Sequence, residues 1–542
     1  MDKKRKERFI LIYIPGILLL FIVLLLIYFS LPTIVTPDSI GYYNYLKIFQ
    51  GDVPLSSWNP VRGPNMPLII YVIVSIFGDT SFGFLIGTFI FFIVTVVIGY
   101  FIIYEVFRYK SSKTAKILVS ILFVVLFVFN PLIIGYYHVM LTEFVAATVA
   151  MLCCLLSIKW INIEIDKSFL KFLFYSLAFI FLSVFMWFVK QPYVITVLFP
   201  LILGTFLSIY KLRNLKNTFL KLFVVVLCFT SIIIGISVWD SILISNSALS
   251  SASWNKDSLS RQLMAGVSNF DEISSDNLSE NDLLEWSDYL NSREMELIKK
   301  IKEQKTEYSG YKLYKVLSIR ESVVIDIVVV PMATEEGDSF KDVMLFFNVV
   351  IREYPQHVLA SYFSNYLAII NLTHLDHTNY VPIKRYLKFS EAHGENEMIG
   401  LAVYYSYSSV LGNLPAVMPY AMESFPQYVR EMNPNEILLK PVFRSLIRSS
   451  LLFLTIVLLV APFLFIFFLY TYLFKSENRL KQRDTLYESI IILFGYSFLH
   501  VLLHSFLGAV VDRYAFPAYP TAIVGLLLLL ALISKKGTKG HL

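Results

Sequence analysis

The sequence has few charges and few cysteines, and each shortage excludes a class of protein. Charged residues make up 16% of its 542 positions, well below the roughly 25% of an ordinary soluble domain. The three cysteines, Cys153, Cys154 and Cys228, all lie inside apolar runs, so neither a disulfide framework nor a CxxC metal site is expected. Glycine-rich nucleotide, Walker, kinase and GxSxG patterns are also missing from the sequence, which argues against cytosolic nucleotide chemistry and serine hydrolysis.

Apolar residues, by contrast, make up 56% of the chain and gather in long runs. A helix needs about 20 mostly apolar residues to cross a bilayer. The sequence therefore predicts an all-α polytopic membrane protein with ten spans, at residues 9–31, 82–107, 117–135, 142–161, 169–189, 194–210, 218–239, 449–474, 487–507 and 515–534. The run at 68–77 is too short to cross, and we expect it to form an interfacial or re-entrant helix in the loop after the first span.

The basic residues predict how these spans are oriented. Lys and Arg cluster in alternate connections, and the positive-inside rule then places both termini and every strong basic cluster in the cytoplasm. The net charge of +6 is explained by this pattern, so no nucleic-acid partner is expected. The N-terminal run is too long for a cleaved signal and lacks a cleavage site, which favours a retained anchor. The predicted location is a cytoplasmic membrane of bacterial type.

Three parts follow from this topology: a module at 1–240 with seven spans, an extracytoplasmic domain at 241–448, and a module at 449–542 with three spans. The middle part is polar enough to form a domain of its own. It carries an amphipathic pattern near 283–301, a β-branched run at 323–330 and a helical pattern at 340–370, so we expect an α or α+β domain.

Asp38 is the first candidate functional residue. It lies just beyond the outer end of the first span, in a Pro-Asp-Ser step that begins the aromatic run containing Tyr42. Asp is also a preferred residue at a helix N-cap, and position alone favours that simpler role. The functional interpretation depends on what the other outer segments contribute.

Three of those outer segments carry further charged residues. Glu143 begins a span, where burial of an ionisable group costs free energy and such a group usually faces a cavity. The alternative is a side chain that extends to the membrane surface. Lys190 and Arg513 lie on the outer side against the positive-inside trend, and Arg62 adds a third cation there. Such cations suggest an anionic ligand such as a lipid phosphate. The alternative is an ion pair with Asp512, Asp38 or Glu143.

The histidines are weaker candidates. His500 and His504 are four residues apart and so share one helix face, but Val501 stands where a zinc peptidase would need glutamate. Hydrogen-bonded interior histidines are favoured over metal ligands. His374, Asp376 and His377 form a run of ligand-type residues without an established spacing, which favours a polar loop.

Five motifs, taken together and in order, resemble the GT-C glycosyltransferases, in particular the protein mannosyltransferase and lipid A aminoarabinose transferase type. The first three are an acidic residue in the first outer loop (Asp38), a basic residue before Pro-x-x-Pro-Leu and a short apolar helix (62–78), and an acidic residue that begins a span (Glu143). The last two are Lys-x-Pro at 190–192 and Arg-Tyr-x-x-Pro at 513–517. The resemblance covers residues 1–239 and, more loosely, the last hundred.

The resemblance implies a function and a site. It implies an inverting enzyme that moves a monosaccharide from a polyprenyl-phosphate donor to an extracytoplasmic acceptor, with Asp38 as general base and Glu143 orienting the acceptor. Asp38 and Glu143 are also the candidate ligands for Mg²⁺ or Mn²⁺, although this chain has Asp38-Ser39 where some relatives have two acids. Lys190, Arg513 and Arg62 would hold the donor phosphate, and the neighbouring candidate substrate-binding residues are Tyr42, His138, Gln191 and Tyr514.

Two other functions stay open on the sequence. A transporter or flippase of lipid-linked glycans would need polar residues along the middle of its spans, whereas the charges of this chain gather at the span ends. A non-catalytic membrane scaffold would bind its partners through residues 241–448.

Overall fold

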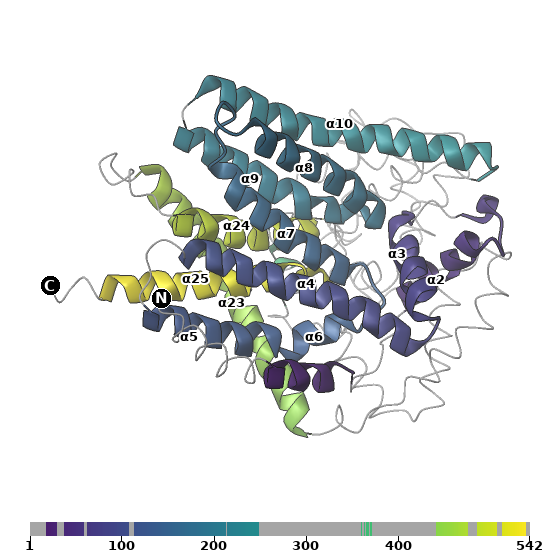
Figure 1. The fold of residues 1–542 in the computed structure, drawn as a ribbon, viewed down its shortest axis with the longest axis horizontal. Helices are drawn as coiled ribbons and strands as arrows, with labels where there is room; N and C mark the ends of the chain where they lie inside the picture. The colour runs from purple at the N-terminus through teal and green to yellow at the C-terminus, as the bar shows by residue number, and fades with distance from the viewer. Residues whose placement is uncertain are drawn as a thin grey trace, which may run out of the picture.

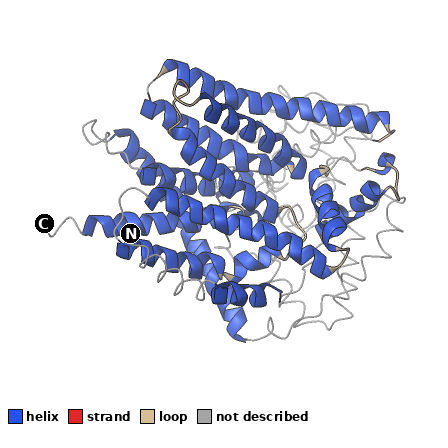
Figure 2. Cartoon of the chain, viewed as in Figure 1, coloured by secondary structure: helices blue, strands red, loops and turns tan. Residues whose placement is uncertain are grey.

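The computed structural model describes residues 18–29, 37–58, 62–107, 113–212, 214–248, most of 359–370, 441–474, 485–506 and 512–537. Every regular element in these ranges is a helix, and no strand occurs among them (Figure 2). The all-α class is therefore confirmed for the described part of the chain. The amphipathic pattern near 283–301, the expected strand at 323–330 and the polar run with His374, Asp376 and His377 lie outside the described residues.

Seven helices in the described ranges are long and apolar enough to cross a membrane. They are α4 (Ser81–Phe107), α7 (Glu143–Ile161), α8 (Phe169–Val189), α9 (Ile195–Leu212), α10 (Leu215–Ser245), α23 (Pro441–Phe474) and α24 (Thr485–Phe506). An eighth candidate is the bent pair of α5 (Lys113–Phe123), with the wide helical turn Val124–Val128, and α6 (Pro131–Tyr137). The chain is thus a multi-pass membrane protein.

The structure supports fewer spans than the ten predicted. The helix at Leu18–Phe29 and the apolar part of α25 (Ala518–Gly537), which extends over Ala518–Ile533, stand where the first and last spans were expected, and within the described residues each apolar stretch has fewer than 18 residues. The short run after Pro67 forms α3 (Asn65–Phe77), a 13-residue helix. The described residues therefore contain seven candidate spans, or eight with the bent pair, and three shorter apolar helices.

The bend before α6 has a local cause in the sequence. The two halves meet at 49°. Pro131 cannot donate a backbone hydrogen bond, and the Asn130 side chain instead caps α6 by accepting from the amides of Leu132 and Ile133 at 3.0 and 3.3 Å. The new helix therefore starts in its own direction, and the span predicted at 117–135 is not straight.

The long helices lie side by side in one bundle, with α23 crossing them more steeply (Figure 1). One end of the bundle, here called the basic end, carries the junction at 162–168 and the ends of α4 at Phe107, α9 at Leu212 and α23 at Phe474. The opposite end, the aromatic end, carries α2 (Pro37–Gln50), α3 and the junctions at 138–142 and 190–194.

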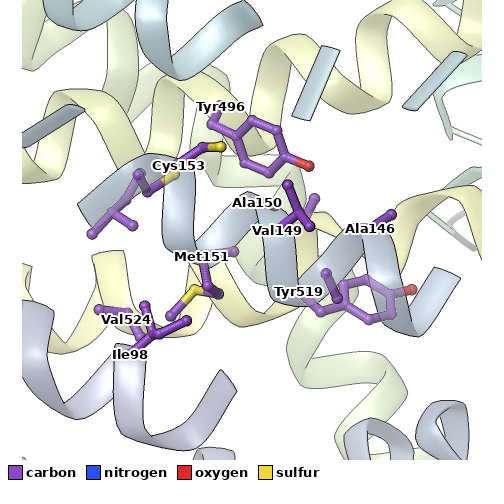
Figure 3. Packing of buried hydrophobic residues seen from close by; sticks show 14 of the residues in the cluster. Ile98, Ala146, Val149, Ala150, Met151, Cys153, Tyr496, Tyr519 and Val524 are labelled. Atoms are coloured by element: carbon purple, nitrogen blue, oxygen red, sulfur yellow. The ribbon is translucent and has the colours of Figure 1, made fainter. Parts of the chain in front are cut away.

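Helix α7 is the centre of the bundle. It packs against α4, α8, α9, α24 and α25, and it is the most buried of the candidate spans. Figure 3 shows its small residues Ala146, Ala150 and Cys153 surrounded by Tyr496 of α24 and Tyr519 of α25. Small side chains allow helices to approach closely in a membrane, where van der Waals packing replaces the hydrophobic effect between helices.

The first outer loop forms two helices, of which α3 was predicted, and packs on the aromatic end. The α3 helix contacts α2, α4 and α8. Asn65 Nδ2 donates to Phe185 O of α8 at 2.8 Å, and a Cβ atom at Gly63 would lie 2.1 Å from Phe188 O. The residue at 63 must therefore be glycine for the loop to lie this close to the end of α8.

A short helical stretch near 359–370 was expected in the extracytoplasmic part but packs against the bundle. Asn365 Nδ2 donates to Ser505 O of α24 at 3.1 Å, and Tyr366 OH donates to Leu458 O of α23 at 3.0 Å. Tyr366, Ile369 and Ile370 are accordingly part of the buried core.

Candidate functional site

Lys190 and Tyr514 are 324 residues apart in the chain and meet at the aromatic end. Lys190 Nζ donates to Tyr514 OH at 3.0 Å and lies 4.6 Å from the centre of the same ring. It also lies 5.7 Å from the ring centre of Tyr193. The structure therefore brings the Lys-x-Pro and Arg-Tyr-x-x-Pro motifs into direct contact, and the lysine ammonium sits against aromatic faces.

Local backbone features position Lys190 for this contact. Its backbone is extended and ends α8, and Pro192 starts the following turn Gln191–Val194. The Lys190 amide donates to Met186 O at 3.1 Å, and its carbonyl accepts from the Tyr193 amide at 2.9 Å. Gln191 is half-buried beside it. These two backbone hydrogen bonds fix the position from which the Lys190 side chain extends.

His500 and His504 line the same place from α24. His500 Nε2 donates to Tyr514 O at 2.9 Å, and Tyr496 OH donates to His500 Nδ1 at 3.2 Å. His504 Nδ1 lies 2.9 Å from His500 O, and its ring centre is 4.8 Å from that of Tyr514. Both histidines are buried and hydrogen-bonded, which agrees with the favoured interpretation, but they lie against the candidate site.

The segment before Glu143 joins the same end of the bundle. The ring of Tyr136 in α6 stacks on that of Phe516 with 4.1 Å between centres. His138, directly after α6, is fully buried, and its ring centre lies 4.3 Å from that of Tyr28. Three of the predicted outer segments, 136–143, 190–194 and 512–516, are therefore linked by packed aromatic rings.

Glu143 occupies the position that the sequence predicted for it, in the first turn of α7. Its side chain is buried, and Oε2 accepts a hydrogen bond from Thr142 Oγ1 at 3.3 Å. An acidic group at this position is also stabilised by the positive end of the helix dipole. The alternative of a side chain that reaches the surface does not agree with this burial.

Arg62 and Tyr42 meet in the first outer loop. The guanidinium carbon of Arg62 lies 4.5 Å from the ring centre of Tyr42, and Trp58 Nε1 donates to Arg62 O at 3.0 Å. Trp58 also packs against Trp239 of α10, with ring centres 5.4 Å apart. This loop thus presents a second cation held on an aromatic ring.

Two predicted site residues are described only by their backbone. Asp38 is the second residue of α2, after Pro37, and so does not stand at the cap position before the helix. Arg513 lies in the short helical turn Asp512–Ala515, next to Tyr514. The side chains of Asp38 and Arg513 lie outside the described part, and the structure does not test their roles.

The described residues do not form a metal cluster. A group of three His, Cys, Asp or Glu side chains suited to a metal ion does not occur among them. The predicted pair of Asp38 and Glu143 would supply two carboxylates, and Mg²⁺ is usually bound by one or two carboxylates together with substrate phosphates.

The basic end contains buried charges that the sequence reasoning did not single out. Lys211 Nζ binds Glu488 Oε1 at 2.7 Å, and Lys221 Nζ donates to Trp160 O at 2.8 Å and to Ser208 Oγ at 2.6 Å. The signal was present, because Lys221 and Glu488 both fall inside predicted spans, where ionisable side chains are rare.

No family model, curated protein or solved structure matches this chain.

Proposed function

We propose that this chain is an inverting glycosyltransferase that moves a monosaccharide from a polyprenyl-phosphate donor to an acceptor on the outer side of the membrane. The observation that carries the proposal is the contact between Lys190 and Tyr514, because it joins two distant motifs around one cation on aromatic rings. An ammonium held at the end of the bundle suits the phosphate head group of a lipid.

The proposed topology has ten spans. Besides the eight candidates, the helix at Leu18–Phe29 and α25 would complete crossings, with both termini in the cytoplasm. The basic end then faces the cytoplasm, in agreement with the positive-inside rule, and the aromatic end faces outward. Tyr and Trp are enriched where a membrane protein meets the interface, and Tyr45, Trp58 and Trp239 cluster at this end.

The proposed reaction is a single displacement. Asp38 takes the proton of the acceptor hydroxyl while the acceptor oxygen forms a bond to the anomeric carbon. The bond between that carbon and the phosphate oxygen breaks, and its electron pair leaves with the polyprenyl phosphate. Lys190, with Arg513 and Arg62, stabilises the charge that develops on the departing phosphate. Glu143 orients the acceptor, with Tyr42, His138, Gln191 and Tyr514 as the nearby substrate contacts.

The test is donor consumption by the purified full-length protein in detergent. A panel of polyprenyl-phosphate sugars is offered with a membrane acceptor extract, with and without Mg²⁺ or Mn²⁺. We expect one donor to be consumed and Asp38→Asn to lower its turnover by about 100-fold or more, because general base catalysis contributes about 10² to 10⁴.

Asp52→Asn is the matched control, since Asp52 lies in the same loop and makes a partly exposed ion pair with Lys47 at 3.6 Å. We expect its turnover to stay within about twofold of wild type, because exposed pairs contribute little. Unchanged turnover in Asp38→Asn would remove Asp38 as the base. Equal losses in both variants would point to the fold of the loop, and no consumption of any donor would reject the enzyme.

A further inference from the structure

His504 and Lys190 lie against the same two aromatic rings. The ring centre of His504 is 5.6 Å from that of Tyr193 and 4.8 Å from that of Tyr514. Lys190 Nζ is 5.7 and 4.6 Å from the same two ring centres. Lys190 and His504 are therefore held against the same pair of aromatic rings.

The hydrogen bonds of His504 define which nitrogen faces a ligand. A carbonyl oxygen only accepts, so Nδ1 carries the proton that is donated to His500 O at 2.9 Å. In the neutral ring, the lone pair is then on Nε2. This atom is buried and has no hydrogen-bond partner among the described residues. A buried acceptor without a donor is rare and calls for an explanation.

The neighbouring histidine shows the contrast. Both nitrogens of His500 are bonded, Nε2 to Tyr514 O at 2.9 Å and Nδ1 to Tyr496 OH at 3.2 Å. His500 therefore cannot serve as a second ligand in a metal site with His504. A hydroxyl group is the partner that fits the remaining lone pair, because it donates one hydrogen bond and needs no further protein ligand.

We propose that Lys190 and His504 form a subsite for a phosphate ester with a hydroxyl on the carbon next to the ester carbon. Lys190 binds the phosphate, and His504 Nε2 accepts a hydrogen bond from the hydroxyl. A sugar joined to phosphate through its anomeric carbon has this arrangement, and the choice of such a ligand rests on the proposed function. His504 is then a positioning residue that distinguishes a glycosylated lipid phosphate from a bare one.

The experiment measures binding of two probes to the full-length protein in detergent by microscale thermophoresis. The probes are decaprenyl phosphate and decaprenyl-phosphate mannose, with decaprenyl-phosphate arabinose as a second glycosylated probe. We expect His504→Phe, which keeps an aromatic ring, to weaken the glycosylated probe that wild type prefers by about tenfold. A tenfold loss corresponds to one neutral hydrogen bond. Binding of decaprenyl phosphate should change by less than about twofold, because this probe has no sugar hydroxyl for His504 to bind.

Three further variants keep the result interpretable. His504→Gln places an amide oxygen near the position of Nε2 and should restore binding to within about threefold of wild type. Lys190→Met should weaken all probes by about tenfold or more, because it removes a charged partner of the phosphate. Tyr496→Phe removes the donor to His500 alone and should leave all probes within about twofold, since it does not touch His504.

The outcomes separate this inference from the proposed function. The subsite is overturned if His504→Phe binds the glycosylated probe as wild type does, or if it weakens all probes equally. It is also overturned if wild type binds none of them. If wild type binds the glycosylated probe selectively through His504 but transfers its sugar to no acceptor, the subsite stands and the glycosyltransferase is rejected.

Discussion

The two ends of the bundle hold their positive charges in different ways. At the basic end, Lys211 binds the carboxylate of Glu488 at 2.7 Å, and Tyr472 OH donates to the same oxygen at 3.2 Å. Lys221 donates to a carbonyl and a hydroxyl oxygen. At the aromatic end, Lys190 and Arg62 lie on the ring faces of Tyr514 and Tyr42.

This difference indicates which cations mainly stabilise the fold and which can bind an anionic ligand. A salt bridge to a buried carboxylate neutralises a cation, and breaking it leaves the partner charge inside a medium of low dielectric. An aromatic face holds a cation in place without cancelling its charge. We therefore expect substitutions at the basic end to affect mainly stability and those at the aromatic end to affect mainly binding.

The largest effect on stability is expected from Lys211→Met. Glu488 is fully buried, so Lys211→Met removes the cation that its carboxylate binds in the interior. We expect a loss of about 3 to 5 kcal/mol in the free energy of unfolding, as measured for broken buried pairs. The measurement is unfolding in detergent micelles followed by steric trapping.

The control for this prediction is Lys167→Met, which breaks an exposed i,i+3 pair with Glu164 at 2.6 Å and should cost less than about 0.5 kcal/mol. The double variant Lys211→Met with Glu488→Leu should recover most of the loss, because both charges are gone. Equal stability of the single and double variants would show that the loss does not come from the Glu488 carboxylate left in the interior.

A smaller loss is expected from Lys221→Met. This lysine is buried in α10 and ties it to Trp160 at the end of α7 and to Ser208 of α9. Methionine fills a similar volume but cannot donate, so two hydrogen bonds are lost at about 1 to 3 kcal/mol in total. Thermal unfolding of the purified protein measures the effect.

Lys216→Met is the matched control, since Lys216 lies in the first turn of the same helix and pairs with Asp166 at an exposed site. Its effect should stay below about 0.5 kcal/mol. A Lys221→Met protein as stable as the Lys216→Met protein would mean that the buried ammonium costs as much to bury as its hydrogen bonds return.

The smallest effect on stability is expected from Lys190→Met at the aromatic end. The Lys190 side chain is only partly buried, and its bond to Tyr514 is worth about 1 kcal/mol or less. The free energy of unfolding should therefore change little, while donor turnover falls by at least tenfold. A large loss of stability with unchanged turnover would mean that Lys190 stabilises the fold and does not bind the donor, contrary to the contrast between the two ends.

The helices were predictable because their signals are local. Apolar runs of about 20 residues predicted the seven helices that are long and apolar enough to cross a membrane, and Gly78 after a short run predicted the end of α3. The Asn-Pro step at 130–131 was also visible in the sequence, but whether such a step bends a span depends on the packing around it.

The candidate site was predictable only as a set of segments. The alternation of spans placed Lys190 and Tyr514 on the same side, and the structure puts them in contact. That His504 Nε2 accepts no hydrogen bond among the described residues could not be predicted. It depends on the bond between Nδ1 and His500 O, which forms only when α24 is folded and packed. The burial of Lys221 similarly results from the packing of three helices.

The length of α10 connects the candidate site to the thickness of the host membrane. Its 31 residues extend about 46 Å, more than the roughly 30 Å of a hydrocarbon layer. Such a helix matches the layer by tilting, and a thinner bilayer requires a larger tilt. Because Trp239 of α10 packs on Trp58 of the first outer loop, the lipid composition around the protein is mechanically linked to the loop that carries Arg62.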